Sequence, residues 1–397
     1  MSKQQIHVGV DATSWINDRG FGRFTRELML ALARRDGRFR YTLVFDRPPE
    51  IDLPPQFGVI AAGATRDLNE AAVGDQSRSP GDLLKMSAAV RKADFDIFFY
   101  PAVYSYFPLL TRMPCIVCYH DTTAERIPHL LFPTKMNHRL WQAKTALSKL
   151  QMTRAMTVSE TSARDLENIL KIPRDKIDVV TEGADPVFRM IDDKSLSRAA
   201  REKYNIPQDA DLLMSVGGMN AHKNILGLLK ALPAVAARLP NVHLGIVGDI
   251  SGKGFWDNVP ELMKFVDGNP ALKSRVHFTG YVPDEELVHL FSGAAALVFP
   301  SLWEGFGLPA VEAMACGLPV LASNRGSLPE VVGEAGLFYD PEDLGQIEAR
   351  LMQFFTDDAL RAALTAAAPV RAATFSWDKA AELAEASFEK CYAKTRR

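Results

Sequence analysis

Apolar runs of strand length alternate with helical patterns along the whole chain. The repeated order is strand, turn, helix, which predicts an α/β fold of doubly wound parallel sheets covered by helices. The first series of predicted strands covers 5–11, 40–45, 95–101, 115–121, 155–159 and 177–183. The second series covers 211–218, 242–249, 275–280, 296–301 and 319–323, and helices are predicted over 22–35 and 224–239.

Two separate series of strands predict two domains. Between them, residues 184–207 are charged and only weakly patterned, so we predict a linker there and domains over 1–187 and 188–375. The last segment, 376–397, has the pattern of a helix that begins near Trp377. On pattern alone, this helix belongs to one domain or bridges the two.

The composition is that of an ordinary globular chain, with 397 residues, 47% of them hydrophobic and 24% charged. A net charge of -2 provides no basic field for nucleic acid, so we expect no such partner. Without an apolar signal core at the amino terminus, we expect a cytoplasmic protein. Cys115 and Cys118 lie three apart in a predicted strand and indicate buried thiols. The small polar residues of 61–82 predict a mobile loop.

Ligands of doubly wound sheets bind beyond the carboxyl ends of the strands, so the loops that follow strands are the candidate sites. In the first such loop, Gly20 and Gly22 precede a helix whose amino terminus could receive phosphate. An ordinary strand-to-helix turn explains these glycines equally well. In a second loop, Gly217 and Gly218 follow a strand and Lys223 opens a helix. Lys223 could reach a diphosphate as a point charge, or it could be a solvated surface residue.

The third loop, "PSLWEGFGLPAVEAM", has a glutamate on each side of a glycine-rich turn. Backbone N–H groups of 305–308 can face an anion, whereas Glu304 and Glu312 would repel phosphate and suit hydroxyl donors. We expect Pro309 at the first helical position and Glu312 in the first turn, where dipole capping is the alternative role. A ligand with phosphate in the middle and polyols at both ends fits this loop, and a nucleotide sugar has that layout.

His120 is a further candidate residue at a strand end. Several other segments resemble known motifs but are not expected to form binding or catalytic sites. His120 closes the strand "CIVCYHD" and could donate to a sugar hydroxyl, although a buried histidine is often structural. Asp94 and Asp96 resemble a metal-binding DxD but are expected to be the solvated start of a strand. The run "GDISGKG", 248–254, is one residue short of a P-loop, and no GxGxxG follows the first strand.

At these residues the chain resembles the retaining family 4 glycosyltransferases. The stretch "EGFGLPAVEAMACGLPVLASNRGSLPEVV" resembles that family's signature, in which seven residues separate two glutamates. Similarity extends to "GFGRFTREL", "HDTT", "TVSETSARDL", "VVTEGADPVF", "VGGMNAHKN" and "FTGYVPDEEL". The resemblance implies the GT-B fold: two Rossmann-like domains facing a central cleft, with the carboxy-terminal helix crossing back onto the first domain.

Carried over residue by residue, the resemblance assigns a role to each candidate. Glu304 and His120 would lie at the donor hexose, and Lys223 would act at the leaving diphosphate. The remaining assignments are Gly305, Phe306, Gly307 and Leu308 to the donor sugar, Gly20, Gly22, Arg23, Gly218 and Lys223 to the diphosphate, and Glu312 and Val282 to the nucleoside. The family needs no metal, and no cofactor is expected, since the nucleotide sugar is a substrate.

The chain departs from the family pattern at Gly218, where an arginine is usual. A leaving diphosphate needs preorganised donors for its growing charge. Lys223 with backbone donors could suffice, Arg23 or Arg325 could take over, or activity could be weak. We favour a substitute cation.

The resemblance predicts a retaining hexosyltransferase that acts on a hydroxyl of a glycan, lipid-linked or small-molecule acceptor. GDP-mannose is the favoured donor and UDP-glucose the alternative. Rival functions are a glycoside hydrolase, an epimerase or phosphorylase on the same fold, and a degenerate transferase that serves as a partner protein. The aromatic run Tyr100, Tyr104, Tyr106 and Phe107 either stacks on an acceptor or belongs to the core. Basic amphipathic sequence around Lys144 and Lys149 leaves room for peripheral membrane contact, and the oligomeric state is not specified.

Overall fold

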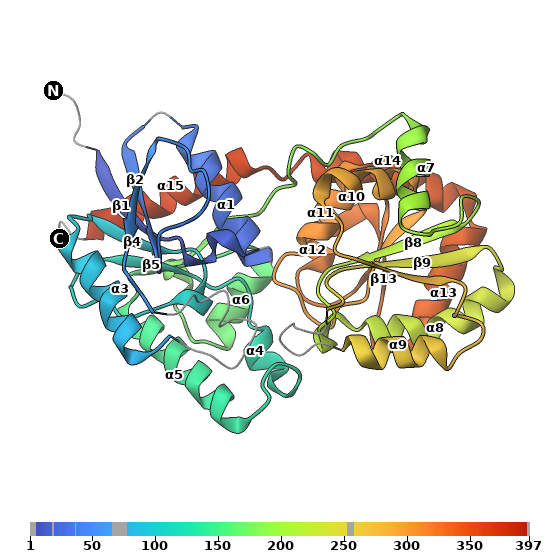
Figure 1. Cartoon of the computed structure of the whole chain (residues 1–397), viewed down its shortest axis with the longest axis horizontal. Coiled ribbons are helices and arrows are strands. Elements are labelled where there is room, and N and C mark those ends of the chain that lie inside the picture. The colour runs from blue at the N-terminus through green and yellow to red at the C-terminus, as the bar shows by residue number, and fades with distance from the viewer. Residues whose placement is uncertain (1–4, 18–19, 36, 66–77, 252–257, 395–397) are drawn as a thin grey trace. The chain divides into compact units, whose positions relative to one another are not determined.

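The chain forms two compact units in the computed structural model, which describes residues 5–17, 20–35, 37–65, 78–251 and 258–394 (Figure 1). The first unit combines Met1–Glu182 with Trp377–Arg397, and the second is Gly183–Ser376. The amino-terminal part of the first unit thus ends at Glu182, whereas the sequence pattern predicted the domain boundary at 187.

The first unit contains a sheet of seven parallel strands in the order β3-β2-β1-β4-β5-β6-β7. The strands are β1 Ile6–Asp11, β2 Phe39–Phe45, β3 Phe57–Ala61, β4 Ile97–Tyr100, β5 Cys115–Cys118, β6 Arg154–Thr157 and β7 Ile177–Val179. The helices are α1 Gly20–Ala33, α3 Pro80–Lys92, α4 Thr123–Arg126, α5 Lys135–Gln151, α6 Glu160–Asn168 and α15 Trp377–Ala393.

The second unit contains a sheet of six parallel strands in the order β10-β9-β8-β11-β12-β13. The strands are β8 Asp211–Val216, β9 Val242–Val247, β10 Val276–Gly280, β11 Ala296–Phe299, β12 Val320–Ser323 and β13 Gly336–Tyr339. The helices are α7 Lys194–Lys203, α8 Ile225–Arg238, α9 Val259–Asp267, α10 Asp284–Gly293, α11 Leu308–Ala315, α12 Leu328–Val332, α13 Leu344–Thr356 and α14 Asp358–Ala372.

Both sheets are doubly wound, as the alternating pattern predicted. In each sheet the chain runs outward through three strands and then returns to the centre, so its order reverses between β1 and β4 and between β8 and β11. A crevice forms at the carboxyl ends of the strands where the order reverses, and ligands of this fold bind there. The predicted pair of Rossmann-like domains is confirmed. Whether they face a central cleft stays a prediction.

Continuous apolar sequence explains the central strands. All four residues of β4 and of β5 are buried, because parallel strands covered by helices on both faces have no solvated side. Cys115 and Cys118 are buried free thiols in β5, as expected. Asp94 and Asp96 directly precede β4, and the Asp96 carboxylate accepts a hydrogen bond from the His7 N–H at 2.8 Å. Both therefore belong to the start of a strand.

The carboxy-terminal helix α15 packs on the first unit, as the resemblance implied. Phe388 is fully buried, and its ring lies 5.4 Å from that of Phe99 in β4. Asp178 in β7 accepts hydrogen bonds from Ser387 at 2.8 Å and Lys390 at 2.7 Å. Burial alone would raise the pKa of Asp178, but the hydrogen bonds and positive charges around it prevail and lower it.

Some predictions from the pattern are wrong. The strands β3 and β13 were not predicted, and α7 with its capping Asp193 occupies the segment expected to be a linker. The loop expected over 61–82 is shorter, since β3 reaches Ala61 and α3 begins at Pro80, while 66–77 lie outside the described residues. Residues 252–254 of the P-loop look-alike also lie outside them. Among the helices that the structure describes, none is long and apolar enough to cross a membrane.

Truncation of Phe388 tests how strongly α15 holds the first unit together. We expect Phe388→Ala to lower the free energy of unfolding by about 3–5 kcal/mol, because it removes a buried ring and leaves a cavity. Urea unfolding followed by tryptophan fluorescence measures the change. Glu389→Ala is the matched control, because its ion pair with Arg38 is exposed and is worth less than about 1 kcal/mol. Equal unfolding midpoints for the two variants would contradict the packing described.

Candidate active site

The loops that follow β8 and β11 meet at the crevice of the second sheet. These two strands are hydrogen-bonded neighbours, with Leu213 opposite Ala296. The loop after β8 contains a short 3-10 helix, Ala221–Lys223, and the Leu302 N–H in the loop after β11 donates to the His222 carbonyl at 2.8 Å. Residues distant in sequence are thereby held at one edge of the sheet.

An ion pair joins the two loops. The Lys223 ammonium donates to Glu304 Oε1 at 2.6 Å, and the two side chains are only 21% and 12% exposed. Burial alone would raise the pKa of Glu304, but the charge of Lys223 outweighs it and the pKa is lowered. The candidate cation for a diphosphate and the candidate carboxylate for a sugar are therefore partners in this structure.

The turn after Glu304 is buried and held from behind. Gly307 has a φ of +96°, and a Cβ there would lie 2.8 Å from Leu328, so this position requires glycine. The Ser327 hydroxyl donates to the carbonyls of Glu304 at 3.1 Å and Phe306 at 2.9 Å. Gly305, Phe306 and Leu308, which were assigned to the donor sugar, are buried in this turn.

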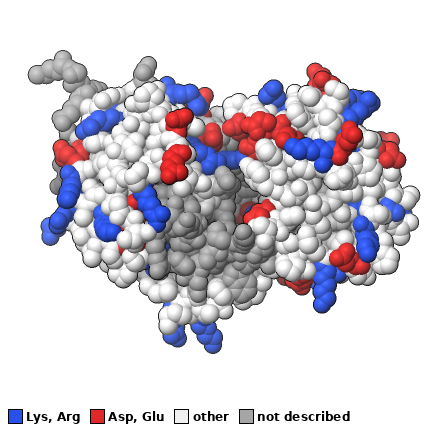
Figure 2. All heavy atoms as spheres, in the orientation of Figure 1, with Lys and Arg blue, Asp and Glu red and all other residues white. Residues whose placement is uncertain are grey.

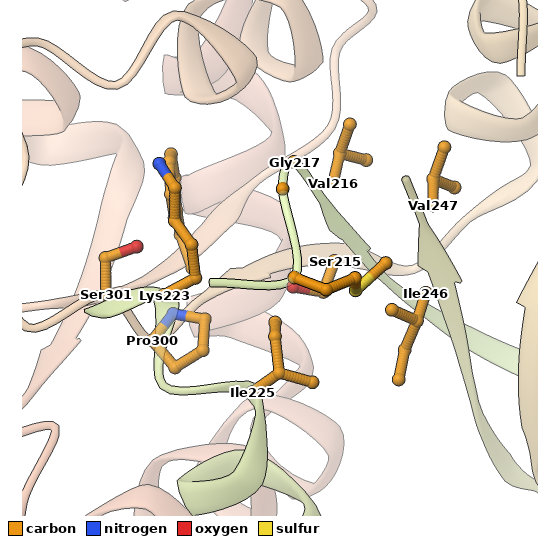
Figure 3. Close-up of a pocket in the computed structure, with 12 residues that line it drawn as sticks. Ser215, Val216, Gly217, Lys223, Ile225, Ile246, Val247, Pro300 and Ser301 are labelled. Carbon is orange, nitrogen blue, oxygen red and sulfur yellow. The ribbon is translucent and has the colours of Figure 1, made fainter. Parts of the chain in front are cut away.

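A small pocket lies beside the ion pair (Figure 3). The side chains of Lys223 and Ser301 lie at one side of it and those of Ile246 and Val247 at the other. Its complete lining is Ser215, Val216, Gly217, Gly218, Met219, Lys223, Ile225, Ile246, Val247, Phe299, Pro300 and Ser301. Two of the predicted diphosphate ligands, Gly218 and Lys223, therefore line one pocket, and Gly218 places no side chain in it.

His222 adds a neutral group at this place. Burial, with a smaller contribution from the charge of Lys223, lowers the pKa of His222 to about 4, so the imidazole is uncharged at neutral pH. Its buried Nδ1 has no hydrogen-bond partner among the described residues. Lys223 is therefore the charged member of the pair of basic residues in this loop.

Glu312 does not occupy the first turn of its helix. The helix α11 begins at Leu308 with Pro309 second, so Glu312 is its fifth residue and capping of the helix dipole does not explain it. Its side chain is 2% exposed. Val282, in the loop between β10 and α10, is also buried. Both residues assigned to the nucleoside thus lie beneath the surface.

The candidates of the first unit gather around the start of α1. His120 follows β5, and its ring packs edge-on against Phe24 with ring centres 4.7 Å apart. Its Nε2 donates to the Pro101 carbonyl at 2.9 Å, and its Nδ1 lies 3.7 Å from Glu182. Burial would lower the pKa of His120, but Cys118 and the Glu182 carboxylate outweigh it and raise the pKa well above the usual range.

Close packing in the same region explains why position 22 is glycine. A Cβ at Gly22 would lie 1.9 Å from the Asn17 carbonyl oxygen, so α1 can pack against the preceding loop only with glycine here. At Gly20, in contrast, a Cβ would meet no atom of the described residues within 4 Å. Arg23 is partly buried in the first turn of α1. Gly20 opens α1, and Gly22 and Arg23 lie in its first turn, so the two glycines expected to precede the helix are part of it.

Arg325 is already engaged by acidic groups. Its guanidinium donates to both carboxylate oxygens of Asp340, at 3.0 and 2.9 Å, and lies 3.3 Å from Glu342. To reach a phosphate, it would have to leave these partners. In the aromatic run, Tyr100, Tyr106 and Phe107 belong to the core, whereas Tyr104 is 40% exposed and its ring stacks on that of Phe21 with ring centres 5.4 Å apart.

Two residues that shape the site, His222 and Ser327, were not among the candidates predicted from the sequence. His222 directly precedes Lys223 in "NAHKN", so its place in a loop after a strand was a usable signal. Ser327, by contrast, acts through hydrogen bonds to a turn 20 or more residues away in sequence, with separations of 23 and 21 residues. No spacing in the chain reveals such a contact.

Two family profiles together match most of the chain. The one described as Glycosyl transferases group 1 matches residues 197–371, and the one described as Glycosyltransferase Family 4 matches residues 19–188. The O-antigen chain mannosyltransferase B of Escherichia coli is 37% identical over 227 residues, which are 56% of this chain and 57% of that protein. The D-inositol 3-phosphate glycosyltransferase of Mycolicibacterium smegmatis is 33% identical over 240 residues, 60% of this chain and 52% of that protein. The chain spans about half the length of these curated relatives.

Solved structures share the fold. Sucrose-phosphate synthase from Thermosynechococcus elongatus has a TM-score of 0.76 at 20% identity, and the match covers 98% of this chain and 100% of that one. Anabaena HepE in complex with UDP and glucose has a TM-score of 0.73 at 17% identity, with 97% and 100% covered. At such identities the likeness concerns the fold alone.

The ion pair should make stability depend on pH in a defined direction. Because the pKa of Glu304 is lowered in the folded state, the pair stabilises the protein above the unfolded pKa of about 4.3, and this contribution is lost as the pH falls through the folded pKa. We expect Lys223→Met to cost about 2–3 kcal/mol of unfolding free energy at pH 7, because it leaves a buried carboxylate unpaired. Urea unfolding from pH 7.5 down to pH 3 should show the difference from wild type shrinking once the pH falls below about 4.3.

Two variants control this measurement. Lys223→Arg keeps the charge and should retain most of the stability, and the double variant Lys223→Met with Glu304→Gln should recover part of the loss because no buried charge remains. A deficit for Lys223→Met that is the same at every pH would contradict the role given to the ion pair.

Proposed function

Because this chain belongs to the family 4 glycosyltransferases, we propose that it transfers a hexose from a nucleoside-diphosphate sugar to a hydroxyl of a glycan, lipid-linked or small-molecule acceptor. The observation that carries the proposal is the Lys223–Glu304 pair, 2.6 Å apart at the β8 and β11 crevice. It provides a cation for a diphosphate next to a carboxylate for sugar hydroxyls. A glycoside hydrolase would need two carboxylates at the bond that breaks and has no use for the lysine.

Donor binding would exchange partners within the ion pair. In this proposal the diphosphate takes the Lys223 ammonium, and Glu304 is released to accept hydrogen bonds from the hexose. The buried turn 305–308 supports the sugar through its backbone, and Gly218 leaves space in the pocket for the phosphates. The nucleoside role of Glu312 and Val282 rests on the resemblance alone, since both side chains are buried.

Transfer would proceed with retention of the anomeric configuration. The bond between the anomeric carbon and the diphosphate oxygen breaks, and its electron pair leaves with the diphosphate. The acceptor oxygen attacks the oxocarbenium-like carbon from the same face, and its proton passes to a phosphate oxygen of the leaving group. Lys223 stabilises the charge that grows on the diphosphate. The proposal assigns no protein general base, metal or cofactor.

A second cation is needed in this proposal because Gly218 stands where the family usually has arginine. Arg325 would have to give up Asp340 and Glu342, so Arg23 in the first turn of α1 is the first substitute to test. Separate substitution of each arginine by glutamine and measurement of turnover distinguishes them. If neither loss slows transfer, no substitute cation operates.

GDP-mannose is the proposed donor. The support is the identity of 37% to an O-antigen chain mannosyltransferase over 227 residues. A UDP-glucose-type donor is the second candidate, because the structure of HepE that shares this fold was solved with UDP and glucose. The comparison with a D-inositol 3-phosphate glycosyltransferase leaves the acceptor class broad.

A thermal-shift panel tests the donor. A ligand of the native state at 100 times its Kd stabilises it by about 2.7 kcal/mol, so GDP-mannose should raise the Tm by several degrees. UDP-glucose, GDP and free mannose at equal concentration are the comparisons. A larger shift with UDP-glucose would indicate that UDP-glucose is the donor. If no nucleotide sugar shifts the Tm, the proposed function is contradicted.

Glu304→Gln separates binding from transfer. We expect kcat to fall by about 10²–10³, because a group that contacts the reacting sugar is lost, while GDP still raises the Tm. Glu261→Gln is the matched control, since that side chain on α9 is exposed and lies outside the pocket. A wild-type protein that binds the donor but transfers no sugar to any acceptor or water would indicate the degenerate alternative.

A further inference from the structure

The helix α5 of the first unit has an unusual inner face. Its buried residues are Thr145 and Ser148. The Ser148 hydroxyl donates to the Thr145 carbonyl at 2.9 Å and lies 2.7 Å from the Tyr119 hydroxyl. A surface helix of a globular protein normally turns its apolar stripe toward the core, so the small polar residues here indicate a second purpose for the apolar ones.

Trp141 packs against the core and donates its indole N–H to Glu125 at 2.8 Å, but four other apolar residues of α5 point outward. Met136, Leu140, Leu147 and Leu150 are 60%, 57%, 42% and 84% exposed. At about 100° per residue, these positions fall within roughly 80° of one another around the helix, so they form one continuous stripe. Contiguous exposed apolar surface of this kind marks an interaction site.

The stripe continues beyond the end of the helix. The Leu109 N–H donates to the Gln151 side chain at 2.9 Å, which brings the neighbouring Leu110, 51% exposed, to the carboxyl end of α5. Figure 1 shows α5 along the lower rim of the first unit, away from its sheet. The patch, which we call the α5 stripe, comprises Leu110, Met136, Leu140, Leu147 and Leu150.

Charge around the α5 stripe has one sign. The sequence of α5, "KMNHRLWQAKTALSKLQ", contains no Asp or Glu. Lys135 and Arg139 are exposed beside the stripe, whereas Lys144 and Lys149 donate to the carbonyls of Tyr104 and Leu170 and so do not flank it as the sequence suggested. In Figure 2 the same rim shows white and blue atoms without red.

We propose that the α5 stripe docks the protein on an anionic lipid bilayer. An interfacial helix buries its apolar face at the boundary of headgroups and acyl chains and places basic residues among acidic headgroups, which is the pattern of α5. A second copy of the chain fits less well, because it would bring two helices of like charge together. Docking does not depend on the proposed function, although it would bring the first unit to a lipid-linked acceptor.

Co-flotation of the full chain with vesicles tests the docking. Vesicles of phosphatidylcholine with 30% phosphatidylglycerol should carry the protein to the top of the gradient, and pure phosphatidylcholine should carry much less. We expect the double variant Leu140→Gln with Leu147→Gln to lower the partition coefficient at least tenfold, because it removes apolar area from the interface. Lys135→Gln and Arg139→Gln each remove one basic charge, and each should lower the partition coefficient about fivefold. Added salt should also lower the partition coefficient, because it screens the attraction to the anionic headgroups.

Leu84→Gln is the matched control, since Leu84 on α3 is 59% exposed and lies outside the α5 stripe. It should leave flotation unchanged, and far-UV circular dichroism should show all variants folded. Flotation of the α5 double variant equal to that of wild type, no flotation on anionic vesicles, or equal flotation on neutral ones would overturn the proposal. So would a concentration-dependent dimer in sedimentation that the double variant abolishes. Nucleotide-sugar thermal shifts without vesicles report on the proposed function separately.

Discussion

The reversal of strand order between β8 and β11 is the constraint on which the candidate site depends. Helices that leave the two strands in opposite directions open a crevice at their carboxyl ends, and the first loop residues on each side must meet there. Lys223 and Glu304, 81 residues apart in sequence, therefore form a partly buried ion pair. Ser327 fixes the turn behind Glu304, and Gly307 lets that turn enter α11. The contacts of these residues can form only because β8 and β11 are neighbouring strands.

Much of the fold could be predicted because central parallel strands are buried on both faces and read as continuous apolar runs. The edge strands β3 and β13 escaped prediction since an edge needs less apolar sequence, and β3 has mostly exposed residues. The candidate loops could be located, because they follow predicted strands. The contact between Lys223 and Glu304, the fifth position of Glu312 in α11 and the role of Ser327 could not, because they depend on exact helix starts and on distant loops packing together.

Two histidines at the candidate sites illustrate how neighbouring groups determine the pKa of an imidazole. His222 has Lys223 as its neighbour and an unpaired Nδ1, so burial prevails and its pKa falls to about 4. His120 lies between the Pro101 carbonyl and the Glu182 carboxylate, and its pKa rises. The pKa of the histidine in the first unit is thus raised, and that of the histidine in the second unit is lowered. Identical side chains in loops after strands acquire opposite electrostatic character from a few neighbouring groups.

The return of α15 to the first unit has a consequence for synthesis on the ribosome. The second unit is one continuous stretch, Gly183–Ser376, whereas the first needs Trp377–Arg397. Asp178 meets Lys390, 212 residues later, and Phe388 fills the space beside β4. The amino-terminal sheet must therefore wait, with a face of β4 uncovered, until α15 leaves the exit tunnel. The unit made second can complete its fold first, and nascent chains from which α15 has not yet emerged would expose an apolar sheet face to chaperones.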